Sequence, residues 1–413
     1  MTSAELEEVL RGCAPHVLAA LVRRYGDFDT TEDALQEALL AASTQWPSCG
    51  MPHNPKAWLI TVASRRLVDE WRTEQARAER EQLVAQRTPP DRFLAPEADR
   101  AAVVDDAVIL LLLCCHPALP QPAQVALTLR AIGGLSTAQI ARAFLVPEAT
   151  MAQRISRAKA RLRQVEARFT TPPASELPER VAAVAHVLYL IFTEGHTATV
   201  GTGLYDVPLT NEAIRLTRQL HEHLPDISEV TGLLALMLLT NARRTARVAE
   251  DATLVPLAEQ DRTLWDRASI REGVGLLEGA LPTGLVGPCQ LQAAIAAVHA
   301  EATRAEDTDW AQIETLYRML DDVAPSPIVT INHAVAVAMV NGPAAGLRML
   351  DPLVRDKQVR RNHRLYAVRG HLLDLEGHRE QARTAYATAA SLTTSIPEQR
   401  YLNAQAARVA AVR

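Results

Sequence analysis

Apolar side chains recur three and four residues apart along almost the whole chain, and this spacing constrains the fold more than any other feature. Such a period places apolar residues on one face of an α-helix. Alternating runs of β-branched residues, which would indicate strands, are missing, and Ala, Leu, Glu, Gln and Arg dominate. We therefore predict an all-α protein.

Proline-rich segments divide the chain of 413 residues into parts. Thr88-Pro89-Pro90 and Thr171-Pro172-Pro173 do not suit a helix interior, so each marks a linker. We expect a small helical domain at 1–78, a linker at 79–101, a second small domain at 102–169, a linker at 170–180, a helical extension at 181–288 and helical repeats at 289–413.

The last segment has a weak internal period. Gly370, Ala382, Tyr386 and Ala389 have the spacing of tetratricopeptide-like repeats, in which small residues lie where paired helices touch. The turn Asn341-Gly342-Pro343 resembles the later turn at Gly377. We predict three helical hairpins between about 289 and 392. The alternative is an ordinary helical bundle.

Membrane insertion and secretion are not indicated. The longest apolar run, residues 107–115, is shorter than the roughly 20 residues that span a bilayer. The N-terminus is acidic and does not read as a signal peptide. The five cysteines form no C-x-x-C pair, which favours a reducing compartment. We expect a cytoplasmic protein that does not contact a membrane.

The segment 135–163 predicts a helix-turn-helix. Ser136 and Gln139 form a capping box that starts a short helix, and Pro147 begins the next one. Residues 151–168 carry six basic side chains and one acidic one. An apolar stripe from Ile155 to Phe169 lies beside the basic stripe. A basic second helix suits the DNA major groove, and the alternative is a solvated arginine face.

Residues 58–72 predict a helix with two unlike faces. Ile60, Ala63, Leu67 and Trp71 point inward, whereas Trp58, Thr61, Arg65, Asp69 and Arg72 point outward. An outward aromatic beside arginines suits stacking on unpaired bases. Alternatively, Trp58 packs on a neighbouring helix. Residues 46–55 are expected to form a long proline-rich loop.

The preceding helix, residues 31–42, has an acidic outer face. Leu35, Ala38, Leu39 and Ala42 form its expected core face. On the opposite side lie acidic and amide side chains together with Leu40. This face suits docking of another protein. The alternative is a solvated surface.

Taken in order, these motifs resemble the extracytoplasmic-function group of bacterial sigma-70-type transcription initiation factors over about residues 10–168. Residues 32–38 are similar to the helix that docks on RNA polymerase core. Residues 54–72 resemble the segment that melts and reads the −10 element, although Arg65 stands where these factors often carry Asn. Residues 135–163 resemble the −35-reading domain, with Leu145-Val146 in place of the usual glycine.

The resemblance implies an alternative sigma factor that binds RNA polymerase core and promoter DNA, and it assigns three sets of residues. The core-polymerase set is Asp33, Gln36, Glu37 and Leu40. The −10 set is Asn54, Trp58, Thr61, Arg65, Arg66 and Arg72. The −35 set is Thr150, Gln153, Arg154, Arg157, Lys159 and Arg161.

The whole chain resembles a subgroup with a long helical extension, on the segments 189–196 and 327–336. A regulatory role is expected for the extension from its size. Residues 189–192 are expected to be buried, and Glu194 and His196 are weak candidates for a polar site. His221-Glu222-His223 lacks the spacing of a metal-binding pair. We expect no enzymatic activity, no cofactor and no metal.

Charge is unevenly distributed. The first 170 residues hold 20 basic and 20 acidic side chains, so the formal net charge of −5 belongs to the rest of the chain. We predict an intramolecular contact in which the acidic extension competes with DNA for the sigma domains. Two rivals stay open: a helix-turn-helix regulator that acts without core polymerase, and a ligand-binding or enzymatic extension fused to a sigma factor.

Overall fold

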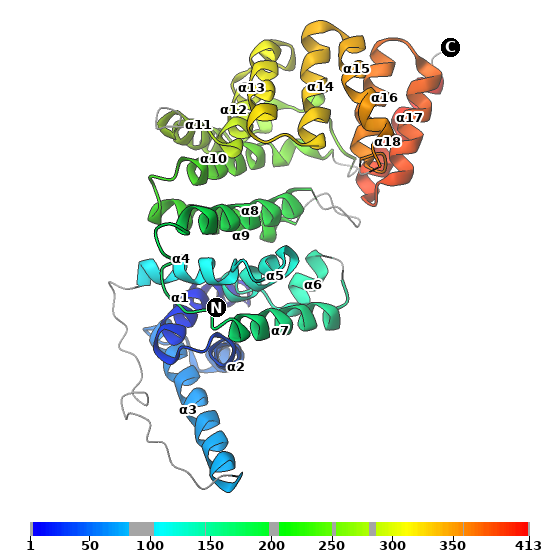
Figure 1. Ribbon diagram of the computed structural model, residues 1–413. Helices are drawn as coiled ribbons and strands as arrows, with labels where there is room; N and C mark the ends of the chain where they lie inside the picture. The colour runs from blue at the N-terminus through cyan, green and yellow to red at the C-terminus, as the bar shows by residue number, and fades with distance from the viewer. Residues whose placement is uncertain are drawn as a thin grey trace. The chain divides into compact units, whose positions relative to one another are not determined.

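The protein is all-α in the computed structural model, which describes residues 3–81, 103–144, 146–197, 206–249, 253–280, 286–357 and 359–411 (Figure 1). The prediction of the fold class is therefore confirmed. The expected linker at 79–101, Leu145 and the Gly201-Thr202-Gly203 segment lie wholly or largely outside the described residues. Among the described helices, none is long and apolar enough to cross a membrane.

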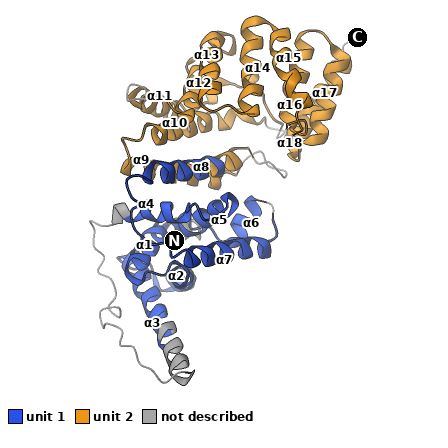
Figure 2. Ribbon diagram, viewed as in Figure 1, with its two compact units in different colours: residues 1–190 blue, residues 191–413 orange. Residues whose placement is uncertain are grey.

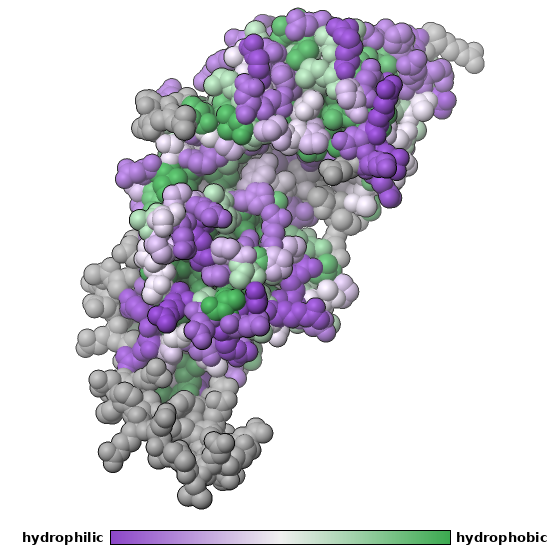
Figure 3. All heavy atoms as spheres, in the orientation of Figure 1, coloured by the Kyte–Doolittle hydropathy of each residue, from purple (hydrophilic) through white to green (hydrophobic). Residues whose placement is uncertain are grey.

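The chain forms two compact units, residues 1–190 and 191–413 (Figure 2). Their boundary falls inside one continuous helix, α8, which begins at Leu177, within the expected linker at 170–180. The expected division at 288 lies inside the second unit. Hydrophilic side chains cover most of the face seen in Figure 3.

The first unit contains the helices α1 to α7 and the first part of α8. Their bounds are α1 Ser3–Tyr25, α2 Phe28–Cys49, α3 Pro55–Glu81, α4 Val103–Cys114, α5 Gln121–Ala131, α6 Thr137–Ala143, α7 Glu148–Gln164 and α8 Leu177–His196.

Helices α1, α2 and α3 pack on one another around fully buried leucines such as Leu18, Leu35 and Leu59. Asp27 caps α2 by accepting a hydrogen bond from the Asp29 backbone N–H at 3.0 Å. The expected loop at 46–55 is wrong in extent, because α2 continues through Pro47 to Cys49. A proline in the last exposed turn removes a single internal hydrogen bond, which water can replace.

Helices α4 to α7 form the second half of the unit. Ser136 and Gln139 make the predicted capping box, with hydrogen bonds of 2.7 and 3.1 Å. The second helix of the pair, α7, ends earlier than its apolar stripe indicates. It stops at Gln164, and Glu166 has a φ of 50°, so Phe169 lies beyond the helix.

In its described residues, the second unit contains the end of α8 and the helices α9 to α18. Their bounds are α9 Val207–His223, α10 Ser228–Ala242, α11 Arg267–Ala280, α12 Pro288–Glu301, α13 Trp310–Val323, α14 Pro327–Asn341, α15 Pro343–Arg355, α16 His363–Leu375, α17 Arg379–Leu392 and α18 Ile396–Ala411.

From α12 to α18 each helix packs on its neighbours in the sequence (Figure 1), and the three predicted hairpins stay a prediction. Gly342 joins α14 to α15, and Gly377 lies in the turn between α16 and α17. Their φ values are 87° and 80°, which residues other than glycine rarely adopt. Ala382, Tyr386 and Ala389 are buried, as their spacing predicts.

Candidate nucleic-acid and protein interface

The outer face of α2 is exposed where the sequence predicts it. Asp33 and Glu37 have side chains that are 68% and 59% exposed, and Leu40 is 69% exposed. Gln36 is half-buried. A large apolar side chain this open to water, beside two carboxylates, offers a surface that a protein partner can cover.

Of the expected core face of α2, Leu35, Ala38 and Ala42 are buried and Leu39 is half-buried. Sequence reasoning missed Glu32, whose carboxylate is also buried, with 2% of its side chain exposed. It accepts hydrogen bonds from the Nε of Arg130 and the Nζ of Lys159, each at 3.0 Å. A buried carboxylate needs such partners.

Lys159 lies on α7 and is buried against α2. Its ammonium donates to the Oδ1 atom of Asp33 at 2.7 Å and lies 2.8 Å from the Oδ1 atom of Asp29. Burial alone would lower the pKa of Lys159, but Glu32 and the hydrogen bonds of the three carboxylates raise it above its usual value. We call Asp29, Glu32, Asp33 and Lys159 the α2–α7 clamp.

The clamp affects two of the predicted residue sets. Asp33 belongs to the core-polymerase set and Lys159 to the −35 set, and here they bind each other. Lys159 therefore cannot contact a phosphate in this conformation. Arg163, which follows one turn later, extends the contact with an ion pair of 3.0 Å to Asp29.

The other members of the −35 set lie on the open side of α7 or at its start. Thr150, Gln153, Arg157 and Arg161 are exposed, and Arg154 is half-buried. Arginine at such positions can contact phosphates or guanine edges. The predicted basic stripe is thus accessible along α7, with Arg154 half-buried, whereas Lys159, a member of the −35 set outside the stripe, is buried.

The −10 set is spread over the start and the middle of α3. Arg65, Arg66 and Arg72 are exposed, and Arg66 pairs with Glu37 of α2 at 3.3 Å. Trp58 is half-buried and contacts the buried Trp46 edge to face, at 5.3 Å between ring centroids. In this conformation Trp58 therefore packs on a neighbouring helix, which was the alternative to an outward-pointing ring.

Asn54 and Thr61, the remaining members of the −10 set, make local hydrogen bonds. The side-chain oxygen of Asn54 accepts from the Ala57 backbone N–H at 3.0 Å, which caps the start of α3. The Thr61 hydroxyl donates to the Ala57 carbonyl at 2.8 Å. Both positions support the helix, whatever else they contact. Trp71 has a side chain outside the described residues.

Family comparisons agree with this division of the first unit. A family model of sigma-70 region 2 matches residues 10–77, and a model of sigma-70 region 4 matches residues 109–162. The chain is a sigma factor of the sigma-70 family. Helices α1 to α3 thus belong to region 2, and α5 to α7 to region 4, so RNA polymerase core and promoter DNA are its partners.

Further comparisons concern the extension and the chain as a whole. A model described as a family of unknown function (DUF6596) matches residues 180–281. An uncharacterised protein of Rhizobium meliloti (strain 1021) is 41% identical over 408 residues, which cover 98% of this chain and 96% of the relative. No solved structure matches the chain.

The weak polar candidates at the end of α8 form a packed contact. His196 is buried and stacks on Phe192 at 5.3 Å between ring centroids. Arg247 donates from one nitrogen to the His196 ring and carbonyl, at 2.6 Å each. Burial and Arg247 lower the pKa of His196 to about 2, so its ring is neutral. The ring is thus part of the packed interior of the second unit.

Glu194 is half-buried, and it already interacts with other groups. Among the described residues, no cluster of His, Cys, Asp and Glu could hold a metal ion. Cys114 and Cys115 are fully buried, and burial raises the pKa of the Cys115 thiol to about 12. These cysteines therefore have the character of core residues.

Proposed function

We propose that this protein is an alternative sigma factor of the extracytoplasmic-function type, which directs core polymerase to promoters with particular −35 and −10 elements. The observation that carries the proposal is the short separation of the matched regions. Regions 2 and 4 are divided only by residues 78–108, so the chain has the two sigma domains and little between them. Such a factor acts in the cytoplasm, where polymerase and promoters are.

Each sigma domain supplies one or two of the proposed contacts. The outer face of α2, with Leu40 at its centre, would dock on core polymerase. The exposed arginines of α3 would hold the −10 strand, and Arg157 of α7 would enter the −35 major groove. These assignments are supported by the exposure of the side chains and by the family of each domain.

The α2–α7 clamp suggests how the free protein is restrained. Lys159 engages the Oδ1 atom of Asp33, whose side chain is otherwise largely exposed, and Lys159 cannot reach DNA while it is buried. We propose that core polymerase competes for the face of α2 and separates region 4 from region 2. The free sigma factor would then bind promoter DNA poorly until polymerase engages it.

The long extension is proposed to regulate this step. It joins the sigma domains through α8, whose first part belongs to the first unit and carries the buried side chains of Val184 and Leu188. Arg180 also donates to the Leu112 carbonyl of α4 at 3.1 Å. A change at the end of α8 can therefore be passed to region 4. The paired helices after 288 would serve as tetratricopeptide-like repeats that contact a partner.

Promoter melting with purified core polymerase tests the proposal. A library of promoter fragments with randomised −35 and −10 positions is incubated with core and the full chain, and unpaired thymines are mapped with permanganate. We expect core-dependent melting at a shared sequence. Specific duplex binding by the protein alone, with no melting when core is added, would instead favour the regulator that acts without polymerase.

A shortened chain tests the regulatory role of the extension. Ending the protein at Thr197 retains all of α8, whereas an earlier cut after Ser175 would remove a helix that packs in the first unit. We expect the shortened chain to fold and to change the amount of melted promoter at least severalfold. Equal melting and equal promoter choice by the two chains would exclude regulation by the extension under these conditions.

A further inference from the structure

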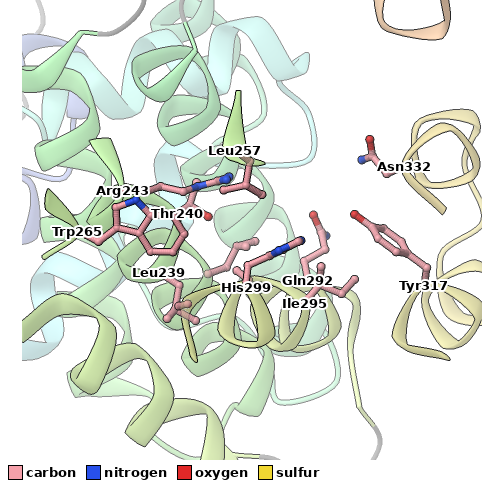
Figure 4. Close-up of a pocket in the computed structure, with 13 residues that line it drawn as sticks. Leu239, Thr240, Arg243, Leu257, Trp265, Gln292, Ile295, His299, Tyr317 and Asn332 are labelled. Carbon is pink, nitrogen blue, oxygen red and sulfur yellow. The ribbon is translucent and has the colours of Figure 1, made fainter. Parts of the chain in front are cut away.

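A cavity of about 300 Å³ lies wholly within the second unit (Figure 4). It is bordered by α10, α12, α13 and α14, together with Leu257 and Trp265 from the segment between α10 and α11. This volume is at the lower end of those seen for small-molecule sites. Its residues come from both sides of position 288, so a ligand would join the region matched by DUF6596 to the paired helices.

Arg243 supplies a positive charge to this cavity without a negative one to balance it. The arginine follows the end of α10 and is mostly removed from water. Burial lowers the pKa of Arg243, Tyr317 opposes this effect, and the neighbouring Arg262 lowers it further. Among the described residues, no carboxylate forms an ion pair with it. A buried cation without a partner is costly, which favours binding of an anion.

The second arginine beside the cavity is already engaged. Arg262 donates from one terminal nitrogen to the carbonyls of His299 and Ala302, at 2.5 and 2.6 Å. Its guanidinium lies over the ring of Trp265, at 4.8 Å. Asp307 and Glu306 also act on Arg262 and offset part of its charge, so the positive potential at the cavity comes mainly from Arg243, which lines it.

His299 borders the cavity and is neutral, and its Nδ1 atom is itself closed to water. Burial lowers the pKa of His299 to about 4, and Arg243 and Arg262 contribute to the shift. Its Nδ1 atom has no hydrogen-bond partner, and the Nε1 atom of Trp265 also lacks one. Buried polar atoms without partners commonly mark a place where a ligand or water binds.

The remaining walls indicate the shape of the ligand. Apolar side chains, including Leu239, Leu257 and Ile295, lie at different places around the cavity, and the Tyr317 hydroxyl points toward His299 and Gln292 (Figure 4). Gln292 and Asn332 add amide groups near Tyr317. An apolar pocket with a few convergent polar groups is typical of a site for a small organic molecule.

We propose that this cavity binds a small organic anion, whose carboxylate or phosphate group pairs with Arg243 and whose apolar, ring-sized part packs on Leu239, Leu257 and Ile295. The ligand would stabilise the packing of α10 against α12 to α14. This binding site is independent of the proposed promoter activity, so either proposal can fail without the other.

Thermal unfolding and calorimetry of the full chain test the site with four probes. Benzoate and phenyl phosphate present the two anionic groups on a ring, inorganic phosphate lacks the ring, and benzamide lacks the charge. We expect one ring-bearing anion to raise the Tm at millimolar concentration and to bind at least tenfold more tightly than benzamide. The better of the two anions distinguishes a carboxylate ligand from a phosphate ligand.

Three variants make the test specific. Arg243→Gln should lose at least tenfold in affinity for the better anion, and its Tm without ligand should equal or exceed that of the wild type because a buried unpaired charge is removed. Ala296→Phe should also abolish binding, since it fills the cavity and leaves every charge in place. Arg318→Gln, on an exposed side chain of α13, should bind like the wild type.

The proposal is overturned if neither ring-bearing anion binds, or if benzamide binds as well as they do. It is also overturned if Arg243→Gln and Ala296→Phe, with Tm values showing that both fold, retain wild-type affinity. Binding of inorganic phosphate alone, with no gain from the ring, would contradict the organic part of the proposed ligand.

Discussion

At the scale of single residues, Glu32 determines how α2 meets region 4. Its carboxylate accepts from Arg130 and Lys159 in a place from which water is excluded. Attraction between opposite charges is stronger there than at the surface, but so is the cost of leaving either charge alone. Removing one partner should therefore be far more harmful than removing an exposed ion pair.

We predict that Glu32→Gln lowers the free energy of unfolding of the full chain by about 2 kcal/mol, because Arg130 loses its carboxylate partner while Lys159 keeps Asp29 and Asp33. The measurement is urea unfolding followed by circular dichroism. Glu37→Gln is the matched control, since the Glu37–Arg66 pair of 3.3 Å is exposed on both sides and should contribute less than about 1 kcal/mol. Equal losses in the two variants would contradict the buried clamp.

His196 predicts a dependence on pH. Its pKa is lowered from 6.5 to about 2, so the unfolded chain binds a proton between these values and the folded chain does not. The stabilisation is complete above pH 6.5 and declines as the pH falls toward 2, by about 1.4 kcal/mol per pH unit. Between pH 7 and 5, His196→Gln should flatten the fall in Tm.

The control for His196 is His378→Gln, which replaces a histidine with 56% of its side chain exposed. This variant should retain the wild-type dependence of Tm on pH. If His196→Gln and the wild type lose stability in parallel over that range, the neutral buried imidazole does not contribute as proposed.

At the scale of elements, close helix contacts in the second unit depend on small residues. A Cβ atom on Gly370 of α16 would lie 2.9 Å from the Cδ1 atom of the Tyr386 ring on α17, closer than atoms pack. We predict that Gly370→Ala destabilises the chain by about 1–3 kcal/mol in thermal or urea unfolding. Gly275→Ala is the control, because its Cβ meets nothing within 4 Å and should be neutral or slightly stabilising.

A second prediction at this scale concerns the exposed arginines of α7 and their contact with promoter DNA. Arg157→Gln should weaken binding of the polymerase complex to promoter DNA by about tenfold and reduce the salt dependence of binding by about one ion. Filter binding at several salt concentrations measures both effects. Arg168 lies beyond the end of α7, so Arg168→Gln should change neither the affinity for promoter DNA nor its salt dependence. Equal effects at the two positions would indicate nonspecific attraction to DNA.

Local signals in the sequence predicted the elements well. The capping box at Ser136 and the apolar spacing of α2 each involve residues within one or two turns, so their outcome does not depend on the rest of the chain. The clamp could not be predicted, because Glu32 and Lys159 are 127 residues apart. The burial of Lys159 depends on how regions 2 and 4 pack, which its place in a basic stripe does not reveal.

Trp58 illustrates the same limit at the candidate site. Helical spacing places it correctly opposite the core of α3, but it does not show that Trp46 lies at the end of α2. The expected loop at 46–55 hid this neighbour, since a proline was taken to end α2 early. The arginines of α3, which need no partner to stay exposed, were predicted correctly as exposed.

At the scale of the whole molecule, regions 2 and 4 form ion pairs with each other in the free protein. The α2–α7 clamp connects a residue proposed for polymerase to one proposed for DNA. Some of the 20 basic and 20 acidic side chains of the first 170 residues thus pair with each other inside the first unit. If core polymerase separates α2 from α7, its binding should also release Lys159, the one buried member of the −35 set, for contact with DNA.

The most direct test of this account is run-off transcription with purified core polymerase, the full chain and a promoter selected by melting. We predict a transcript that requires both proteins, and an output about tenfold lower for Leu40→Ala, which removes the exposed apolar side chain at the proposed docking face. Leu264→Ala, another exposed leucine, should leave the output unchanged. If core polymerase with the full chain produces no more transcript than core alone, the account is wrong.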